Sequence, residues 1–419
     1  MKLPDLKYID KTYWVLFITL VIVAVIALFS AGSTLVYEKH SVLGPVFTQM
    51  LWLLIGIAIA FFVQFVPSSY IRAFGYPLLL LSIIFGALLV ILPPSNPMVV
   101  NLNGASRWLK IAGVQFQPSE LAKLSLLIVV ADLLARIRTE EDKKKYFFWT
   151  LGLTAVTCLP IMTGNLSTAV LLAGIVLLMW ILARLPWKYI GATVGIAVLL
   201  MTSGYLIVEF GFIRKHRSIE GPFARTITQV KRVDAMFAEM FAKEDKGIDN
   251  ADLDENYQRK IAKVAVARGG KTPFGVFPGN SQERDYLPQA FADYIFAIIV
   301  EESGIVGVIF LIFIYLAILF RACLTSSRFG DYAAMLMVMG LALMLTCQAL
   351  VSMMVAVGLG PVTGQPLPLI SRGGTSAIIT SVYFGIIMAV SREQKELSDR
   401  QQRTTDESLE DVPDITIND

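Results

Sequence analysis

Apolar residues along this 419-residue chain gather into ten long runs, and polar segments of varied length separate the runs. A helix needs roughly 17 to 25 predominantly apolar residues to cross the hydrocarbon core of a bilayer. The pattern therefore predicts ten transmembrane helices, at residues 13–33, 45–66, 74–93, 118–137, 147–163, 166–183, 188–210, 289–320, 332–357 and 373–391. The expected fold class is an all-α, polytopic integral membrane protein.

Lysine and arginine in the short connections indicate the orientation, because these residues are enriched on the cytoplasmic side. The basic connections lie near residues 2–11, 72, 136–145, 184–188, 321–328 and 392–395. All of them fall on one side, so both termini are expected in the cytoplasm. A large loop at 211–288 and shorter loops at 94–117 and 358–372 then face outward. The membrane domain covers residues 1–392, and the polar segment 393–419 is expected to be a disordered cytoplasmic tail.

The composition supports a membrane protein, because 55% of the residues are hydrophobic and only 16% are charged. Cys158, Cys323 and Cys347 show no paired spacing, which argues against a disulfide framework or a cysteine metal site. His40 and His216 stand apart from other ligand types, which argues against a histidine metal site. The net charge of +3 singles out no partner, and no nucleic-acid partner is expected.

Asp293 stands where the polar stretch 281–291 gives way to the apolar run 294–300. A carboxylate at the mouth of a membrane helix is energetically costly, which favours a functional role. Other acidic residues lie near it in the sequence. Asp285 precedes it by eight positions, and Glu301 and Glu302 follow about two turns later. We expect this segment to perform chemistry at a bilayer surface.

A second outward segment, residues 103–123, contains NGASRWLK and QFQPSELAK. Pro118 suits the start of a helix, and Glu120 suits the positive end of its dipole. Glu120 and Lys123 share a helix face at i,i+3 spacing. Two interpretations stay open: an internal ion pair in a capped helix, or a cationic patch that includes Lys123 and binds an anionic headgroup. Arg107 and Trp108 are typical of an interfacial anchor.

The large outward loop ends in a strip rich in glycine and proline, residues 269–280 (GGKTPFGVFPGN). Because flexible backbone directly precedes Asp285, the strip suits a loop that gates substrate, and a plain connector is the alternative. A nucleotide-binding P-loop is disfavoured here, because the upstream glycine, the preceding strand and a cytoplasmic location are all missing.

A third outward segment, residues 358–376, is dense in glycine and proline and cannot form a regular helix. Irregular backbone at membrane depth requires burial in protein or a water-filled cavity. Arg372, followed by two glycines, opens the last predicted helix, where a guanidinium and free amides suit an anion such as pyrophosphate. A structural re-entrant loop with Arg372 at the interface is the alternative.

These three segments together resemble the SEDS family, which includes FtsW, RodA and SpoVE. The matching stretches are residues 107–108 with 117–123, residues 287–296 (LPQAFADYIF) with 301–302, and residues 361–368 (PVTGQPLP) with 371–376 (SRGGTS). The resemblance extends over nearly all ten predicted spans. The chain departs from the family pattern at Asn165, where an aspartate is common, at Ser352, where an asparagine is frequent, and at Arg372, where a tyrosine is frequent.

The resemblance implies a peptidoglycan glycosyltransferase that polymerises lipid II, an undecaprenyl-pyrophosphate-linked disaccharide peptide, outside the bacterial inner membrane. It transfers the catalytic role to Asp293 and supporting roles to Glu120, Lys123 and Asp285. It also implies a class B penicillin-binding protein as partner, together with division proteins. The strip at 278–280 is more similar to FtsW than to RodA, which points to division rather than elongation, and an elongation-type polymerase is the alternative.

A mechanism follows if Asp293 acts as general base. A sugar 4-hydroxyl attacks the sugar 1-pyrophosphate of lipid II with inversion, so one base suffices and no covalent intermediate forms. Cations stabilise the departing undecaprenyl pyrophosphate. The candidates are Lys123, Arg225 and Arg372, or a bound divalent ion such as Mg²⁺ or Mn²⁺. Arg107 and Ser371 are further candidates for binding or supporting the substrate. The rival functions are a flippase for lipid-linked precursors and a scaffold that recruits a transpeptidase. A flippase would need polar groups near the bilayer midplane, whereas the marked residues lie toward the outer face.

Overall fold

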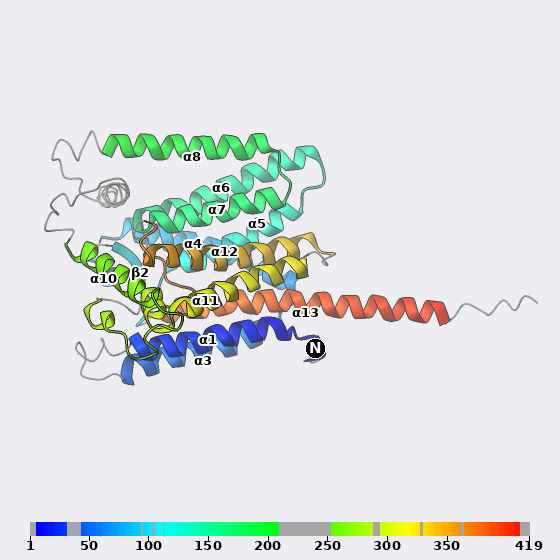
Figure 1. Ribbon diagram of the computed structural model, residues 1–419. Helices are drawn as coiled ribbons and strands as arrows, with labels where there is room; N and C mark the ends of the chain where they lie inside the picture. Colours follow the sequence, from blue (N-terminus) through cyan, green and yellow to red (C-terminus); the bar gives the residue numbers. More distant parts are fainter. Residues whose placement is uncertain are drawn as a thin grey trace, which may run out of the picture.

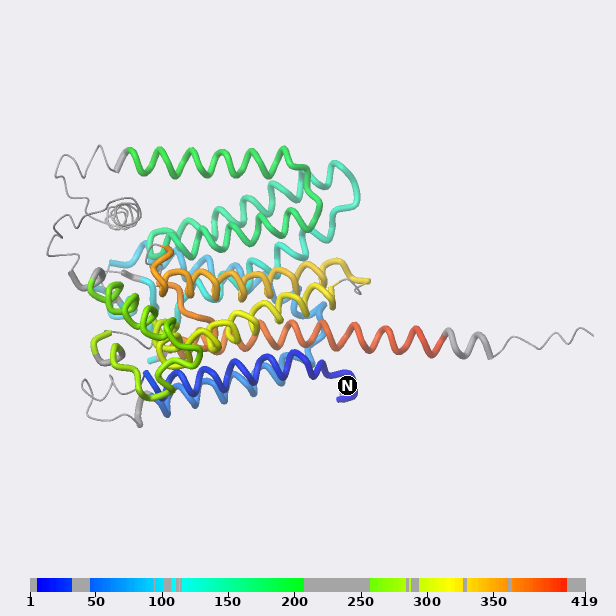
Figure 2. Tube along the Cα trace, viewed as in Figure 1, coloured from blue at the N-terminus to red at the C-terminus, as the bar shows by residue number. Residues whose placement is uncertain are grey.

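The structure, a computed structural model, describes residues 6–31, 43–93, 95–102, 105–111, 113–208, 253–287, 294–326, 330–360 and 364–410. Helices dominate these residues and run roughly parallel or antiparallel to one another as a bundle (Figures 1 and 2). The helices that correspond to the ten predicted spans are α1 (Lys11–Ala31), α3 (Leu43–Val63), α4 (Ser68–Ile91), α5 (Pro118–Ala135), α6 (Glu140–Gly164), α7 (Leu166–Leu182), α8 (Trp187–Val208), α11 (Ile295–Ser326), α12 (Tyr332–Ala356) and α13 (Gly374–Glu410). The predicted all-α membrane architecture is confirmed.

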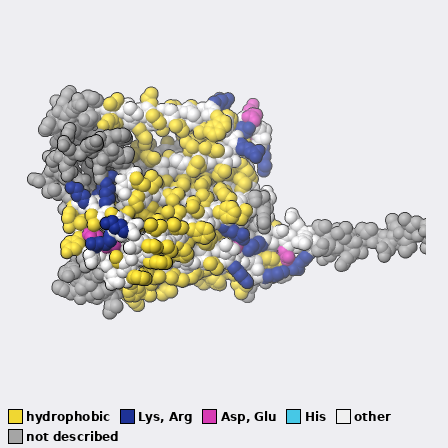
Figure 3. All heavy atoms as spheres, in the orientation of Figure 1, with side chains coloured by type: hydrophobic (Ala, Val, Ile, Leu, Met, Phe, Trp, Pro, Cys, Tyr) yellow, Lys and Arg dark blue, Asp and Glu magenta, His cyan; other side chains and the backbone are white. Residues whose placement is uncertain are grey.

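Eight of these helices are long and apolar enough to cross a membrane. The other two are α7, which has 17 residues, and α5, which carries Glu120, Lys123 and Asp132. On the face drawn in Figure 3, hydrophobic side chains cover the middle of the bundle, and lysine and arginine side chains gather toward its two ends. Such a surface suits a hydrocarbon core between two polar interfaces.

Small residues let several helices approach closely. On α13, Gly385 lies against α3, where an added Cβ would stand 2.8 Å from the Cβ of Val63. On α4, an added Cβ at Gly75 would stand 2.6 Å from a methyl carbon of Ile128 on α5. Helices in lipid associate through this kind of close van der Waals packing rather than through a hydrophobic driving force. The centre of the bundle is α5 and α12, whose side chains are mostly buried.

The end of the bundle away from both described chain ends carries additional structure (Figure 1). Strands β1 (Val99–Leu102), β2 (Ala105–Ile111) and β3 (Val114–Phe116) form an antiparallel sheet, with Val99 opposite Leu109 and Leu109 opposite Phe116. Helix α10 (Leu253–Gly269) and the short helix η4 (Glu283–Tyr286) also lie at this end. The sequence pattern predicted loops for these segments. The Asn-Gly pair at 103–104 is a hairpin signal that could have revealed the sheet.

Helix α11 differs from its prediction in three ways. It begins at Ile295 rather than at residue 289, it ends at Ser326 rather than at residue 320, and Gly304 interrupts it with a positive φ of 63°. The six-residue difference at the start falls on residues 289–294, of which 289–293 lie outside the described part of the chain.

Helix α13 continues to Glu410, although a disordered tail was expected from residue 393. Ion pairs at i,i+4 spacing line this extension, at 3.1 Å between Arg392 and Glu396 and at 3.0 Å between Arg403 and Asp399. The Tyr8 hydroxyl also donates to Asp399 at 2.6 Å. Such pairs support a helix beyond its apolar part, and hydropathy alone does not register them.

Candidate functional site

The start of α5 brings the first two predicted site residues together. Pro118 occupies the first turn of the helix, and the Lys123 ammonium lies 2.7 Å from a carboxylate oxygen of Glu120. The predicted ion pair is therefore present. Both side chains are buried, and Lys123 also donates a hydrogen bond of 2.8 Å to the Gln348 side chain of α12. The positive charge of Lys123 is thus matched inside the protein.

Gln348 connects this pair to the loop that precedes α13. Its amide nitrogen donates to the carbonyl of Pro366 at 3.0 Å. The residue before that proline, Gln365, donates to the Thr168 hydroxyl of α7 at 2.6 Å. On the other side, the Tyr315 hydroxyl of α11 donates to the carbonyl of Pro368 at 2.7 Å. Side chains from three helices therefore fix this irregular loop, as expected for non-helical backbone at membrane depth.

Ser371 and Arg372 close the same loop. The Ser371 hydroxyl is buried and accepts a hydrogen bond from the backbone N–H of Leu367 at 2.8 Å. Arg372 is half-buried directly before α13 begins at Gly374. Ser371 thus stabilises the turn. The predicted anion site at Arg372 stays a prediction, with a helix N-terminus beside it.

A cavity of about 30 Å³ lies beside the start of α5. Arg107 of β2, Ser119 of α5 and Asn165 line it together with residues of α4 and α6. Arg107 donates from Nε to the carbonyl of Gly164 at 2.8 Å, and Asn165 caps α7 by accepting from the N–H of Thr168 at 3.2 Å. The buried Ser119 hydroxyl has no hydrogen-bond partner among the described residues. A space of this size is large enough to hold one water molecule.

The remaining predicted residues are only partly described. Asp285 lies in η4, and its side chain is outside the described part of the structure. Asp293 and Arg225 lie entirely outside the described residues. Tyr294 and Ile295, which follow Asp293, are buried at the end of the bundle that carries η4. In the part of the chain that is described, no three His, Cys, Asp or Glu side chains come together to hold a metal ion, so the role of Mg²⁺ or Mn²⁺ stays a prediction.

Sequence reasoning did not identify Gln348, Gln365 or Thr168. Each is a polar residue in or beside an apolar segment, and such residues in membrane proteins usually face the protein interior. That signal could have marked all three as buried. Their partners could not be assigned, because Gln348 and Lys123 are 225 positions apart in the sequence.

The fold and this site define a polytopic helical membrane protein in which a buried polar network joins α5, α12 and the loop before α13. The family model for the FtsW/RodA/SpoVE cell cycle proteins matches residues 10–396. The chain therefore belongs to this family.

Individual relatives agree with that assignment. A probable peptidoglycan glycosyltransferase FtsW of Nitrosomonas europaea is 32% identical over 354 residues, which is 83% of this chain and 82% of the relative. The peptidoglycan glycosyltransferase MrdB of Escherichia coli K12 is 29% identical over 295 residues, 70% of this chain and 73% of the relative. The fold is similar to that of one chain in a solved structure, which describes the structural coordination of polymerization and crosslinking by a peptidoglycan synthase complex. That similarity has a TM-score of 0.68 at 24% identity and covers 92% of this chain and 98% of the other.

Proposed function

We propose that this chain is a peptidoglycan glycosyltransferase that polymerises lipid II at the outer face of the bacterial cytoplasmic membrane. One observation carries the proposal: two of the family-like segments, around Glu120 and at residues 364–373, are far apart in sequence, and Gln348 of α12 joins them in one buried polar network. Two relatives, which are 32% and 29% identical to this chain, are named probable peptidoglycan glycosyltransferase FtsW and peptidoglycan glycosyltransferase MrdB. A path for lipid flipping would instead need such groups at the middle of the membrane.

Asp293 is the proposed general base. It accepts the proton of the attacking sugar 4-hydroxyl while the bond to pyrophosphate breaks with inversion. The leaving group carries negative charge, so fixed positive groups rather than a general acid stabilise it. Arg107 at the cavity and Arg372 before α13 supply this charge in the proposal, and Arg225 and Asp285 support it from the outward loop. Lys123 has a different role, because Glu120 already balances its charge. It fixes Gln348 and, through it, the loop before α13.

The first experiment compares lipid II polymerisation by the purified wild type and by Asp293→Asn, each with a class B penicillin-binding protein. We expect the variant to fold normally and to lose about 10²- to 10⁴-fold in rate, the usual contribution of a general base. Size-exclusion behaviour and thermal stability in detergent serve as the folding control. An active Asn variant would remove Asp293 from the mechanism. Absence of polymerisation by the wild type, with lipid II still bound, would favour transport or scaffolding.

The partner is proposed to be required for turnover. The similar solved structure comes from a peptidoglycan synthase complex that coordinates polymerization and crosslinking. We expect the chain alone to polymerise lipid II slowly and the class B partner to accelerate it. Rapid polymerisation by the chain alone would contradict this requirement.

A role in division is the proposed biological setting, on the strength of the strip at 278–280. The relatives named FtsW and MrdB leave both settings open. Expression in cells depleted of either the division or the elongation polymerase tests the choice. Rescue of septation supports division, and rescue of rod shape alone would assign elongation.

A further inference from the structure

The strip before η4 is inserted into the hydrogen-bond ladder of α11. We call residues 269–282 the strap. In an uninterrupted helix, the carbonyls of Glu301 and Glu302 would accept from the N–H groups four residues later. Here the carbonyl of Glu301 accepts from the N–H of Val276 at 3.0 Å, and that of Glu302 accepts from the N–H of Phe277 at 2.9 Å. Backbone groups of the strap therefore replace the helical donors.

The exchange is reciprocal. The N–H groups released by the interruption belong to Ile305 and Val306, and they donate to the carbonyls of Thr272 at 3.5 Å and Pro273 at 3.1 Å. The positive φ of Gly304 makes this interruption possible, because L residues with side chains rarely adopt it. The released backbone groups near the break are therefore satisfied by the strap, as burial in or beside a membrane demands.

The Glu301 side chain binds the end of the strap. It is fully buried, and its carboxylate accepts hydrogen bonds from the Ser281 hydroxyl and from the N–H of Gln282 at 3.2 Å. Arg268, just before the strap, adds an ion pair at 3.4 Å. The carboxylate therefore fixes the strap within three residues of Asp285.

The Glu302 side chain binds the strap from the other direction. It is 4% exposed and accepts hydrogen bonds from the Ser30 hydroxyl of α1 and from the N–H of Gly279 at 3.0 Å. Through Glu302 the strap is therefore attached to a second membrane helix as well as to α11.

Glycines allow the backbones of the strap and α11 to approach each other closely. Gly275 has a positive φ of 63°, and an added Cβ there would overlap the backbone of Glu301 and Glu302. An added Cβ at Gly269 would overlap the carbonyl of Val300. The strap therefore contacts α11 backbone to backbone, at a separation that only glycine permits.

We propose that Glu301 and Glu302 are positioning residues that lock the strap into the break of α11 and thereby set the outward half-helix, residues 295–303. The inference rests on the proposed function, because this half-helix begins two residues after Asp293. The strap ends directly before η4, so both flanks of the segment that carries Asp285 and Asp293 are fixed at one point. Misplacement of a reacting group by about 1 Å can cost about 10²-fold in rate, so the locked strap contributes directly to turnover.

The test combines two variants that release the strap with one that keeps it. Glu302→Ala removes the acceptor for the Ser30 hydroxyl and the Gly279 N–H. Gly275→Ala pushes the strap away from α11 and changes no residue of α11 itself. Glu302→Gln keeps an acceptor oxygen in the same place. We expect both alanine variants to lower kcat about tenfold or more with little change in KM, and Glu302→Gln to restore most of the rate.

Limited chymotrypsin digestion reports the strap independently of catalysis. Phe274 and Phe277 are 62% and 64% exposed, but cleavage requires the strap to open locally. We expect cleavage there to be about tenfold faster in both alanine variants than in wild type, because one hydrogen bond to a charged group limits opening by about that factor. Asp10→Asn, which alters a buried carboxylate at the opposite end of the bundle, is the matched control for lost stability.

The outcomes separate the two proposals. Faster cleavage with unchanged kcat would overturn the positioning role and leave the proposed function intact. Unchanged cleavage in both alanine variants would show that Glu302 and Gly275 do not hold the strap in place. Because this assay does not depend on polymerisation, it gives the same answer if the proposed function fails. A loss of kcat in Asp10→Asn equal to that in Glu302→Ala would reduce the effect to general destabilisation and also overturn the positioning role.

Discussion

Lys123 is 1% exposed, so its ammonium is almost completely removed from solvent. A buried charge is tolerated when it is paired and its remaining hydrogen-bonding capacity is used. Glu120 supplies the pairing and Gln348 supplies a second acceptor. Removing one member of such a pair leaves an uncompensated buried charge, whereas removing both leaves none. This difference separates a structural role of the pair from a role in the reaction.

Single and double substitutions at this pair should therefore diverge. We expect Lys123→Met to lower the free energy of unfolding by about 3 to 5 kcal/mol, because it leaves the Glu120 carboxylate buried alone. The double variant Glu120→Gln/Lys123→Met should recover most of that stability. Thermal unfolding in detergent measures both.

Polymerisation assays on the same proteins decide the role of the pair. We expect the double variant to stay at least about tenfold below wild type, because Lys123 no longer holds the Gln348 side chain that donates to the loop before α13. A stable double variant with full activity would show that the pair is only structural.

At the residue scale, the sequence could predict a contact where the two partners are local. The Glu120–Lys123 pair follows from i,i+3 spacing on one helix and is present. The link from Lys123 to Gln348 depends on how α5 packs against α12, which no local pattern specifies. The catalytic role of Asp293 is assigned from the sequence, and the described structure begins again directly after it, with Tyr294 and α11.

At the scale of elements, hydropathy located the ten long helices because each needs an apolar run of membrane length. It placed the start of α6 too late, at residue 147. The helix begins at Glu140, because Thr139 and Asp142 form a capping box in a polar segment. Hydropathy also missed the break at Gly304. The strap fills this break, and a tertiary contact between two separate segments leaves no signal in a hydropathy pattern.

The close contact between α3 and α13 permits a test of helix packing. We expect Gly385→Ile to lower the free energy of unfolding by about 1 to 3 kcal/mol, because the new side chain would overlap Val63 and the backbone of Ala60. Gly191→Ile on α8 is the matched control, because an added Cβ at Gly191 meets no atom within 4 Å. Thermal stability in detergent compares them. Equal stability of the two variants would show that α3 and α13 do not require this close approach.

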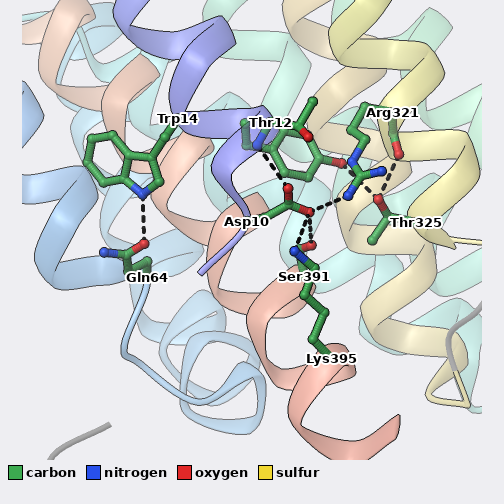
Figure 4. A network of polar contacts seen from close by, with 9 residues as sticks. Asp10, Thr12, Trp14, Gln64, Arg321, Thr325, Ser391 and Lys395 are labelled. Carbon is green, nitrogen blue, oxygen red and sulfur yellow. Dashed lines mark hydrogen bonds and ion pairs between the residues drawn. The ribbon is translucent and has the colours of Figure 1, made fainter. Parts of the chain in front are cut away.

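At the scale of the whole molecule, a second buried polar network lies at the start of α1, at the end of the bundle away from α10 (Figure 1). Figure 4 shows this network from close by. Its centre is Asp10, directly before α1 and 1% exposed. Arg321 of α11 and Ser391 of α13 each donate to its carboxylate at 2.7 Å, and Lys395 lies 3.4 Å from it. One carboxylate therefore joins the start of α1 to α11 and α13. At the other end of the bundle Glu302 of α11 accepts from Ser30 of α1, so these two helices are tied at both ends.

The Asp10 network predicts a pH dependence of stability. Burial raises the pKa of the Asp10 carboxyl, but hydrogen bonds from Arg321 and Ser391 and the nearby charge of Lys395 outweigh burial, so the pKa lies below the ordinary value for aspartate. A carboxyl with a lowered pKa stabilises the folded state above the pKa of the unfolded chain, about 3.9, and this contribution is lost as the pH falls through the lower folded-state value.

We therefore expect Asp10→Asn to be less stable than wild type by about 1.5 to 3 kcal/mol at pH 7, the range for hydrogen bonds to a charged group. The difference should shrink as the pH falls below about 4, because the wild-type carboxyl then also becomes neutral. Thermal unfolding in detergent from pH 7 to pH 3 measures it. Glu140→Gln is the control, since the Glu140 side chain is 82% exposed and its ion pair with Lys143 should contribute little at any pH. A difference for Asp10→Asn that stayed constant with pH would mean that the charge of Asp10 does not hold the three helices together.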